Sequence, residues 1–337
     1  MTCTLDFREG LAKHLRRFDG HLIACLSVTP KNLKIYARFA RQHAGRFLAA
    51  RVREARTPIP PAPHRPTPDR WSDERLTVAW LGHATVLMNF YGTWLLTDPV
   101  LRSRIGVNVA GLMTVGPRRI VRPALGVRDL PALDAVLVSH SHMDHCDLPT
   151  LRRLPRTAHA VVQRRNRDLV RRFRHASELD WGQSVEVKGV RVEALEVNHW
   201  GARRLTDRHR GYGGFLMTKN GRAVVFGGDT AYTRAFADLR PRLKIDLAIL
   251  PIGAYDPYVY HHANPEQSWA MRREMDATFI LPMHHSTFRL GREPDAEPIE
   301  RLLAAAGQER WRVALREPGQ TWTMPEEEET TEALIRA

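Results

Sequence analysis

The stretch VLVSHSHMDHCD at residues 136–147 places four side chains of the metal-ligand type directly after an apolar run. Alternate residues of an extended backbone share one face, so we expect His140 and His142 to point the same way. Asp144 and His145 follow after one spacer and can turn toward a second point in space. This spacing strongly indicates a metal site, and the fold must complete that site with residues from elsewhere in the chain.

Further ligand-type residues follow other predicted strands. In chain order they are His199 after 191–197, Asp229 after 222–227, and His284 with His285 after 278–282. Each of these residues alone is more often a structural polar residue. Zinc takes four or five nitrogen and oxygen ligands, which one loop cannot supply for two ions. Together with the 140–145 loop, these strand ends therefore favour a shared site.

Short apolar runs alternate with helical patterns from about residue 75 onward, which indicates an α/β layered domain. Strands are predicted near 77–81, 85–90, 94–97, 135–139, 159–163, 191–197, 213–218, 222–227, 246–250 and 278–282. Helices are predicted over 164–174 and 265–275. The second of these begins with Asn264 as its cap and Pro265 in its first turn.

The first part of the chain has a different character. Residues 1–57 read as a basic helical extension, with arginines between apolar residues in KIYARFARQHAGRFLAARV. A proline-rich linker at 58–69, a main domain at 70–325 and an acidic tail at 326–337 complete the expected organisation. The amphipathic helix either packs on the main domain, lies on an anionic membrane surface, or contacts a second copy of the chain in a homodimer.

The charge and the cysteines limit the partners and the compartment. The formal net charge is +14, and residues 1–70 hold 14 Lys and Arg against 5 Asp and Glu. Nucleic acid is a disfavoured partner, because no basic patch is interleaved with aromatic residues that could stack on bases. Three widely spaced cysteines favour a reducing compartment, and no apolar run is long enough to span a bilayer. We expect a cytoplasmic protein, either free or peripheral at the inner membrane face.

The chain resembles the metallo-β-lactamase superfamily in the order of its motifs, which are HxHxDH, a single His, GD and a final His after a strand. Within it, the chain is most similar to the N-acyl-phosphatidylethanolamine-hydrolysing phospholipase D group, and the ascorbate-phosphate lactonases are more distant. Stretches that carry this likeness include LGHATVLMNF (81–90), FGGDTAY (226–232) and HHANPEQS (261–268). The resemblance covers about residues 70–325 and implies an α/β fold, a four-layer αββα sandwich with a two-metal site at one edge.

The resemblance also implies a role for each matching residue. One ion would be held by His140, His142 and His199, and the second by Asp144, His145 and His284, with Asp229 bridging. The family pattern fits MHHSTF with His284, rather than His285, as the last ligand. Asp98 matches an aspartate that orients a ligand histidine, and His262 matches a histidine near the substrate phosphate. Asp144 and His262 are thus the candidate catalytic residues. Alternatively, Asp98 only forms a turn before Pro99, and His262 is a surface histidine before a helix.

The cofactors expected from this ligand set are two divalent metal ions, with zinc favoured by the ligand types. Such a pair acidifies a bridging water and stabilises charge on a phosphoryl or acyl oxygen. The resemblance implies a phosphodiesterase of the phospholipase D type acting on N-acyl-phosphatidylethanolamine-like phospholipids. The alternative is a lactonase or sugar-phosphate hydrolase on a soluble substrate, and a nuclease is less favoured. His142 stands where an iron-containing redox branch has Glu, which argues against an oxygen-reducing centre.

Overall fold

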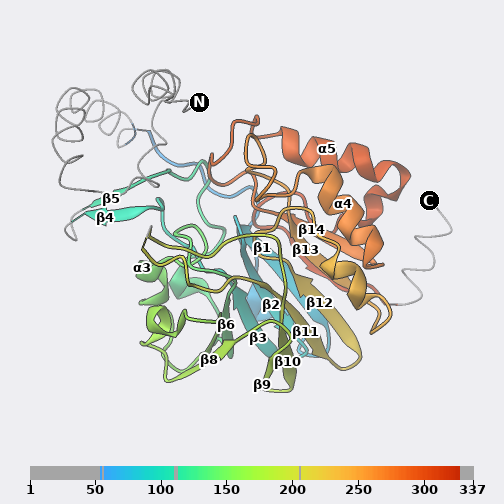
Figure 1. Cartoon of the computed structure of the whole chain (residues 1–337), viewed down its shortest axis with the longest axis horizontal. Helices are drawn as coiled ribbons and strands as arrows, with labels where there is room; N and C mark the ends of the chain where they lie inside the picture. Colours follow the sequence, from blue (N-terminus) through green and yellow to red (C-terminus); the bar gives the residue numbers. More distant parts are fainter. Residues whose placement is uncertain (1–53, 55–56, 110–112, 205, 327–337) are drawn as a thin grey trace, which may run out of the picture.

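The computed structural model describes residues 54, 57–109, 113–204 and 206–326, so the predicted helical extension and acidic tail lie almost entirely outside the described residues. Two mixed β-sheets pack face to face at the centre (Figure 1). The first sheet contains, in spatial order, β15 (Thr321–Thr323), β1 (Leu76–Gly82), β2 (Thr85–Phe90), β3 (Thr93–Thr97), β6 (Ala135–Val138), β7 (His159–Gln163) and β8 (His175–Leu179).

The second sheet contains, in spatial order, β14 (Phe279–Met283), β13 (Leu247–Pro251), β12 (Arg222–Phe226), β11 (Gly214–Lys219), β10 (Val190–Leu195) and β9 (Ser184–Val187). A separate hairpin joins β4 (Val107–Val109) and β5 (Met113–Val115). Both large sheets mix antiparallel neighbours with parallel ones. Parallel pairs link β3, β6, β7 and β8 in the first sheet and β12, β13 and β14 in the second.

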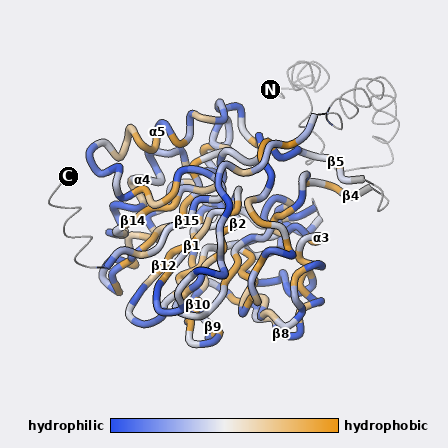
Figure 2. Tube along the Cα trace, turned by 180° about the vertical axis from the view of Figure 1, so that it is seen from behind, coloured by the Kyte–Doolittle hydropathy of each residue, from blue (hydrophilic) through white to orange (hydrophobic). Residues whose placement is uncertain are grey.

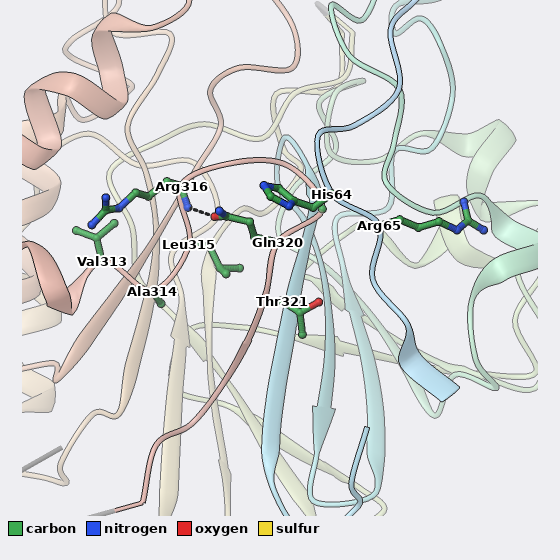
Figure 3. Close-up of a pocket in the computed structure, with 9 residues that line it drawn as sticks. His64, Arg65, Val313, Ala314, Leu315, Arg316, Gln320 and Thr321 are labelled. Carbon is green, nitrogen blue, oxygen red and sulfur yellow. Dashed lines mark hydrogen bonds between the residues drawn. The ribbon is translucent and has the colours of Figure 1, made fainter. Parts of the chain in front are cut away.

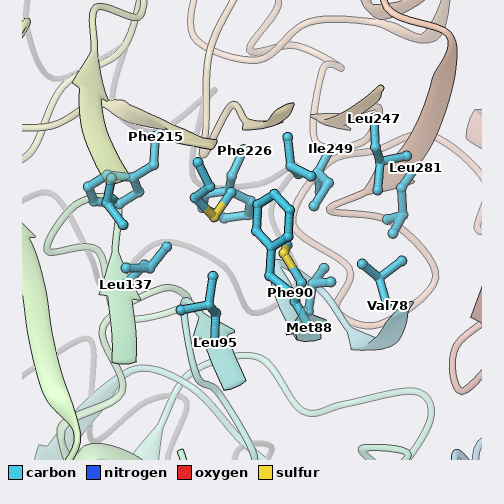
Figure 4. Close-up of a cluster of buried hydrophobic side chains, with 14 of the residues drawn as sticks. Val78, Met88, Phe90, Leu95, Leu137, Phe215, Phe226, Leu247, Ile249 and Leu281 are labelled. Atoms are coloured by element: carbon cyan, nitrogen blue, oxygen red, sulfur yellow. The ribbon is translucent and has the colours of Figure 1, made fainter. Parts of the chain in front are cut away.

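The main hydrophobic core fills the space between the two sheets. Phe90 from β2 meets Phe215 and Phe226 from the second sheet, and all three side chains are fully buried (Figure 4). Central strands such as β2 and β13 are buried on both faces, which is why they read as continuous apolar runs rather than as alternating ones. Figure 2 shows hydrophobic stretches along the strands and hydrophilic stretches mainly in the connecting loops.

Helices cover the outer faces of the sheets unequally. Helices α4 (Pro265–Glu274) and α5 (Glu297–Ala306) pack on the second sheet, where Trp269, Met271 and Leu302 join a second hydrophobic cluster (Figure 1). The outer layer on the first sheet is built from the short helix α3 (Leu148–Leu151) and from 3-10 turns. The 3-10 turns of the molecule are η1 (Pro68–Arg70), η2 (Val127–Asp129), η3 (Arg167–Val170), η4 (Ala235–Leu239) and η5 (Gly307–Arg312). The four-layer α/β sandwich is confirmed.

The helix predicted over 164–174 is wrong, and only the turn η3 forms there. Arg165 has a φ of +60°, outside the helical region. The Asn166 amide, which the prediction places inside the helix, instead donates to the carbonyls of Gln163 at 3.1 Å and Gly211 at 2.9 Å. These bonds tie the segment to a distant loop, and the chain then enters β8, a strand that the sequence analysis did not predict.

The helix predicted at 265–275 is confirmed as α4, together with its cap. Asn264 accepts a hydrogen bond from the Gln267 backbone at 2.9 Å, and the Gln267 side chain accepts one from the Asn264 backbone at 3.0 Å. This reciprocal pair satisfies two backbone donors that the first helical turn leaves free. The cap residue Asn264 lies two residues after His262, so the start of α4 is fixed close to that histidine.

The proline-rich segment at 58–69 lies along the main domain. The backbone N–H of Arg122 donates to the Pro60 carbonyl at 2.9 Å, and its guanidinium donates to the Ile59 carbonyl at 2.8 Å. Gly319 has a φ of +91°, and a Cβ there would lie 1.8 Å from the His64 carbonyl oxygen. Glycine at this position therefore lets the segment pass closely over the loop before β15.

Candidate metal centre

The ligand-type residues converge because the strands that precede them run in the same direction. Strands β1, β3 and β6 are codirectional in the first sheet, and β10, β12 and β14 are codirectional in the second. Codirectional strands release their following residues at one edge of a sheet. The residues released there are His83 after β1, Asp98 after β3, His140 after β6, His199 after β10, Asp229 after β12 and His284 after β14.

The first cluster joins His140, His142, His199 and Asp229, and it matches the set predicted for one ion together with the predicted bridge. Nδ1 of His142 lies 2.8 Å from Nε2 of His140 and 3.3 Å from Nε2 of His199. The Asp229 Oδ2 atom lies 3.9 Å from Nε2 of His140 and 3.8 Å from Nε2 of His199. Three imidazole nitrogens and a carboxylate oxygen thus face a common point.

The second cluster joins Asp144, His145 and His284, the set predicted for the other ion, together with His83. The Nε2 atoms of His145 and His284 lie 3.5 and 3.4 Å from Oδ2 of Asp144. The same two nitrogens lie 3.1 Å from Oδ2 and 3.2 Å from Oδ1 of Asp229. Asp229 therefore contacts residues of both clusters, as a bridging carboxylate would.

Several buried polar atoms of these clusters have no hydrogen-bond partner, although burial of such atoms is costly. They include Nε2 of His142, His145 and His284, Nδ1 of His284, and both carboxylate oxygens of Asp229. Imidazole nitrogens and carboxylate oxygens are the ligands that zinc takes in hydrolytic sites. The donor set and its atoms without a hydrogen-bond partner fit divalent metal ions.

Opposite charges inside the site offset the effect of burial on the pKa values of its residues. Burial lowers the pKa of His284, but the carboxylates of Asp229 and Asp144 outweigh burial and raise it to about 9. Burial raises the pKa of Asp229, yet the surrounding imidazoles hold it well below its usual range. The pKa of Asp144 is held low in the same way, and that of His145 is raised by both carboxylates against the effect of burial. The carboxylates remain ionised, which is the form that binds a cation.

Hydrogen bonds from behind orient the histidine rings. Asp98 Oδ2 accepts from Nδ1 of His145 at 2.7 Å and from the Ser139 hydroxyl at 2.6 Å. The Ser139 oxygen lies 2.9 Å from Nδ1 of His140, and Nδ1 of His199 donates to the His261 carbonyl at 2.9 Å. Each bond occupies Nδ1 and leaves Nε2 facing the cluster, the arrangement by which metal sites fix their histidine ligands.

The adjacent histidines His284 and His285 point in different directions. His284 has a φ of +65° and faces both Asp144 and Asp229. His285 is equally buried, but its ring packs on Trp80 with centroids 4.6 Å apart, and its Nδ1 bonds Ser286 at 2.8 Å. The geometry places His284, rather than His285, in the second cluster.

His262 lies at the more exposed side of the clusters. Its Nδ1 atom is 3.7 Å from Oδ2 of Asp229, and its ring centroid is 5.2 Å from those of His199 and His284. The His262 side chain is 15% exposed, whereas those of His199 and His284 are fully buried. Burial lowers the pKa of His262 to about 4, so its ring is neutral at pH 7.

The sequence analysis assigned no role to His83, which belongs to the same site. Its Nε2 atom lies 3.1 Å from Oδ2 of Asp144, and its ring packs against that of His284 at 4.1 Å. The available signal was its position directly after a predicted strand, in the stretch LGHAT, which is also the position of the other residues of the site.

A separate surface pocket lies next to β15 (Figure 3). It is lined by residues that include His64, Arg65, Arg316 and Gln320, and none of its lining residues belongs to the histidine clusters. His64 pairs with Glu317 at 2.9 Å and Arg65 with Asp129 at 3.0 Å. Since both of these basic side chains already have acidic partners, the pocket gives no indication of a ligand.

Clusters of histidine and aspartate at one edge of an α/β sandwich define a metal-dependent hydrolase. More specifically, the chain belongs to the metallo-β-lactamase superfamily, since the model of the beta-lactamase superfamily domain matches residues 93–285. No helix in the described part of the chain has the length and apolar character needed to cross a membrane.

The chain is similar to three known proteins. An uncharacterized protein of Mycobacterium tuberculosis is 36% identical over 328 residues, covering 94% of this chain and 83% of that protein. The N-acyl-phosphatidylethanolamine-hydrolyzing phospholipase D 1 of Caenorhabditis elegans is 31% identical over 255 residues, covering 69% of this chain and 70% of the relative. The crystal structure of a metallo hydrolase from Ignicoccus hospitalis matches with a TM-score of 0.55 at 20% identity, covers 75% of this chain and 99% of that one, and supports the fold alone.

Proposed function

We propose that this protein is a binuclear metal-dependent phosphodiesterase of the phospholipase D type, acting on N-acyl-phosphatidylethanolamine-like phospholipids. The observation that carries the proposal is the contact of Asp229 with histidines of both clusters, which gives two groups of ligands one shared carboxylate. The substrate class is suggested by the similarity to the Caenorhabditis elegans phospholipase D.

Each of the two clusters would hold one ion. His140, His142 and His199 would hold one ion, Asp144, His145 and His284 the other, and Asp229 would bridge them. Zinc suits this set of imidazole and carboxylate ligands. When bound, such a pair of ions supplies hydroxide near neutral pH and stabilises negative charge on a phosphoryl oxygen.

The protein's own residues orient the substrate and control protons. Asp144 is held ionised by the imidazoles around it, so it acts as an anion and not as a proton donor. His262 is neutral and lies at the more exposed side of the clusters, so its single N–H group can donate a hydrogen bond to a phosphoryl oxygen of the substrate. These are the two catalytic roles in the proposed reaction.

Exposed aromatic side chains beside the site favour a lipid over a soluble substrate. Trp200 is 40% exposed and packs edge-on against His142 at 4.3 Å. Tyr258 and Tyr260 are 45% and 82% exposed, and the Tyr258 carbonyl accepts the backbone N–H of His262. Tyrosine and tryptophan suit the boundary between lipid and water, because each has an apolar ring and a polar tip. We therefore propose a peripheral position at the inner membrane face, to which the basic residues of 1–57 would add electrostatic attraction.

The test compares N-acyl-phosphatidylethanolamine vesicles with soluble bis-p-nitrophenyl phosphate, for the wild type and for Tyr260→Ala. We expect zinc-dependent hydrolysis of both substrates by the wild type. The variant should lose activity on vesicles and keep its activity on the soluble ester. Tyr260 is far more exposed than the residues of the clusters, and it is not one of the proposed metal ligands. Hydrolysis of lactones or sugar phosphates, with no action on vesicles, would favour the soluble-substrate alternative instead.

A further inference from the structure

We propose that His83 is a positioning residue, which holds the Asp144 carboxylate in place and fixes the loop of His284 against it. The inference rests on the proposed function, because it assigns His83 to the second cation site of that proposal. His83 is 1% exposed, and no predicted ligand role accounts for an imidazole at this place.

The side chain of His83 reaches Asp144 from β1, in a distant part of the sequence. Nε2 of His83 lies 3.1 Å from Oδ2 of Asp144. A carboxylate can only accept, so Nε2–H donates and Nδ1 is the unprotonated nitrogen. His83 also packs its ring on His284 at 4.1 Å and edge-on against Phe288 at 5.2 Å. These contacts leave the imidazole little freedom to rotate.

The main chain of His83 is held by the loop of His284. Its carbonyl accepts the backbone N–H of His284 at 3.1 Å and the indole N–H of Trp80 at 2.7 Å. Its own N–H donates to the Thr287 hydroxyl at 2.8 Å. The backbone adopts a φ of +58°, an uncommon conformation for a residue with a side chain, which persists only where the surroundings impose it. One residue thus couples the positions of Asp144 and His284.

The contacts distinguish His83 from the ligand histidines. His145 and His284 each approach both Asp144 and Asp229 within 3.5 Å. His83 approaches Asp144, but no ion-pair contact within 4.0 Å joins it to Asp229, although both residues are described. The ligand atoms of His83, Asp144, His145 and His284 lie within 4.8 Å of one another, and within this group His83 is the histidine that approaches Asp144 alone. Partners of this kind typically change metal affinity about 10–100-fold when they are removed.

The test uses His83→Phe, which keeps a ring but removes the donor, and His83→Gln, which keeps an N–H donor. His285→Phe is the matched control, since His285 is also a buried histidine, but its ring packs on Trp80 and its Nδ1 bonds Ser286. Zinc stoichiometry is measured by elemental analysis, and affinity by competition with a chromogenic chelator. We expect His83→Phe to bind two equivalents at saturation, one of them about 10–100-fold more weakly. His83→Gln should recover part of that loss, and His285→Phe should match the wild type.

Three outcomes would overturn the inference. Wild-type zinc affinity in His83→Phe would show that the contact between His83 and Asp144 does not affect metal binding. Saturation of that variant at one equivalent of zinc would show that His83 is itself a ligand. His83→Ala repeats the test without a bulky ring, and failure of both variants to fold in excess chelator, seen by circular dichroism, would make the residue purely structural. A wild type that binds fewer than two equivalents, or that leaves bis-p-nitrophenyl phosphate intact, refutes the proposed function itself whatever the His83 variants do.

Discussion

Asp98 accepts a hydrogen bond from Nδ1 of His145 at 2.7 Å, and both side chains are fully buried. The same carboxylate accepts the hydroxyl of Ser139 at 2.6 Å and its backbone N–H at 2.7 Å. These bonds hold the opposite ring nitrogen of His145 3.1 Å from Asp229. A turn-forming role before Pro99 does not account for three such donors, so Asp98 orients a residue of the site.

We expect Asp98→Asn to weaken zinc binding about 10–100-fold. The Asp98 carboxylate accepts hydrogen bonds with both of its oxygens, whereas an amide has one acceptor oxygen. The loss is measured by chelator competition. Asp147→Asn is the matched control: Asp147 is a buried aspartate two residues after His145, but it caps α3 through Thr150. It should lower stability and leave zinc affinity unchanged. Equal zinc affinity in both variants would contradict the role of Asp98.

The strands were largely predictable because their burial leaves a direct trace in the sequence. β2 and β13 are covered on both faces and read as continuous apolar runs. β8 was not predicted, since HASEL buries only its last residue fully and resembles a loop. The apolar spacing in 164–174 also fits a helix, but the Asn166 side chain bonds a loop far along the chain instead, and no local pattern contains that information.

The site was predictable where ligand-type residues follow strands, and less so where a partner is distant. Asp229 and His199 could be identified because each follows an apolar run. His83 also follows an apolar run, but its role could not be identified, since the sequence does not show that Asp144 lies within hydrogen-bonding reach of it. Which of two adjacent histidines faces the site depends on a φ of +65° at His284, a backbone detail that sequence pattern does not determine.

Asp229→Asn should abolish turnover while the protein remains folded. The substitution removes the charge shared by both clusters, so neither proposed ion keeps its full set of anionic ligands. Metal ions contribute several kcal/mol to transition-state stabilisation, and each 1.4 kcal/mol corresponds to about tenfold in rate. We therefore expect a loss of at least about a thousandfold in kcat/KM on bis-p-nitrophenyl phosphate. Activity near the wild-type level in a correctly folded variant would refute the bridging role.

The stability of the metal-free protein should fall as the pH rises from about 6.5 to 9. Burial lowers the pKa of His284, but Asp229 and Asp144 raise it from 6.5 to about 9 in the folded state. The folded state therefore holds this proton more tightly, and the resulting stabilisation is complete below pH 6.5 and lost as the pH passes 9. The shift corresponds to a change on the order of 3 kcal/mol. The pKa of His145 is raised in the same direction.

Urea unfolding in excess chelator at pH 6, 7.5 and 9 measures this dependence. The zinc-loaded protein is the control, because the ion replaces the proton on each ligand nitrogen and zinc binding strengthens as the pH rises. Its stability should not fall over the same interval. A metal-free protein that becomes more stable toward pH 9 would show that His284 is not paired with the carboxylates.

Asn264→Ala should destabilise the protein without weakening zinc binding. The Asn264 side chain accepts from the Gln267 backbone at 2.9 Å, and its removal leaves a donor of α4 without its cap. Loss of such a cap costs about 1 kcal/mol, or roughly 2–4 °C in Tm for a domain of this size. Asn264→Ser keeps an acceptor and should remain close to the wild type. Asn264 lies two residues after His262. A fall in kcat on bis-p-nitrophenyl phosphate with unchanged zinc affinity would therefore show that the cap also holds His262 in place. A fall in zinc affinity would contradict the separation of the helix from the ligand clusters.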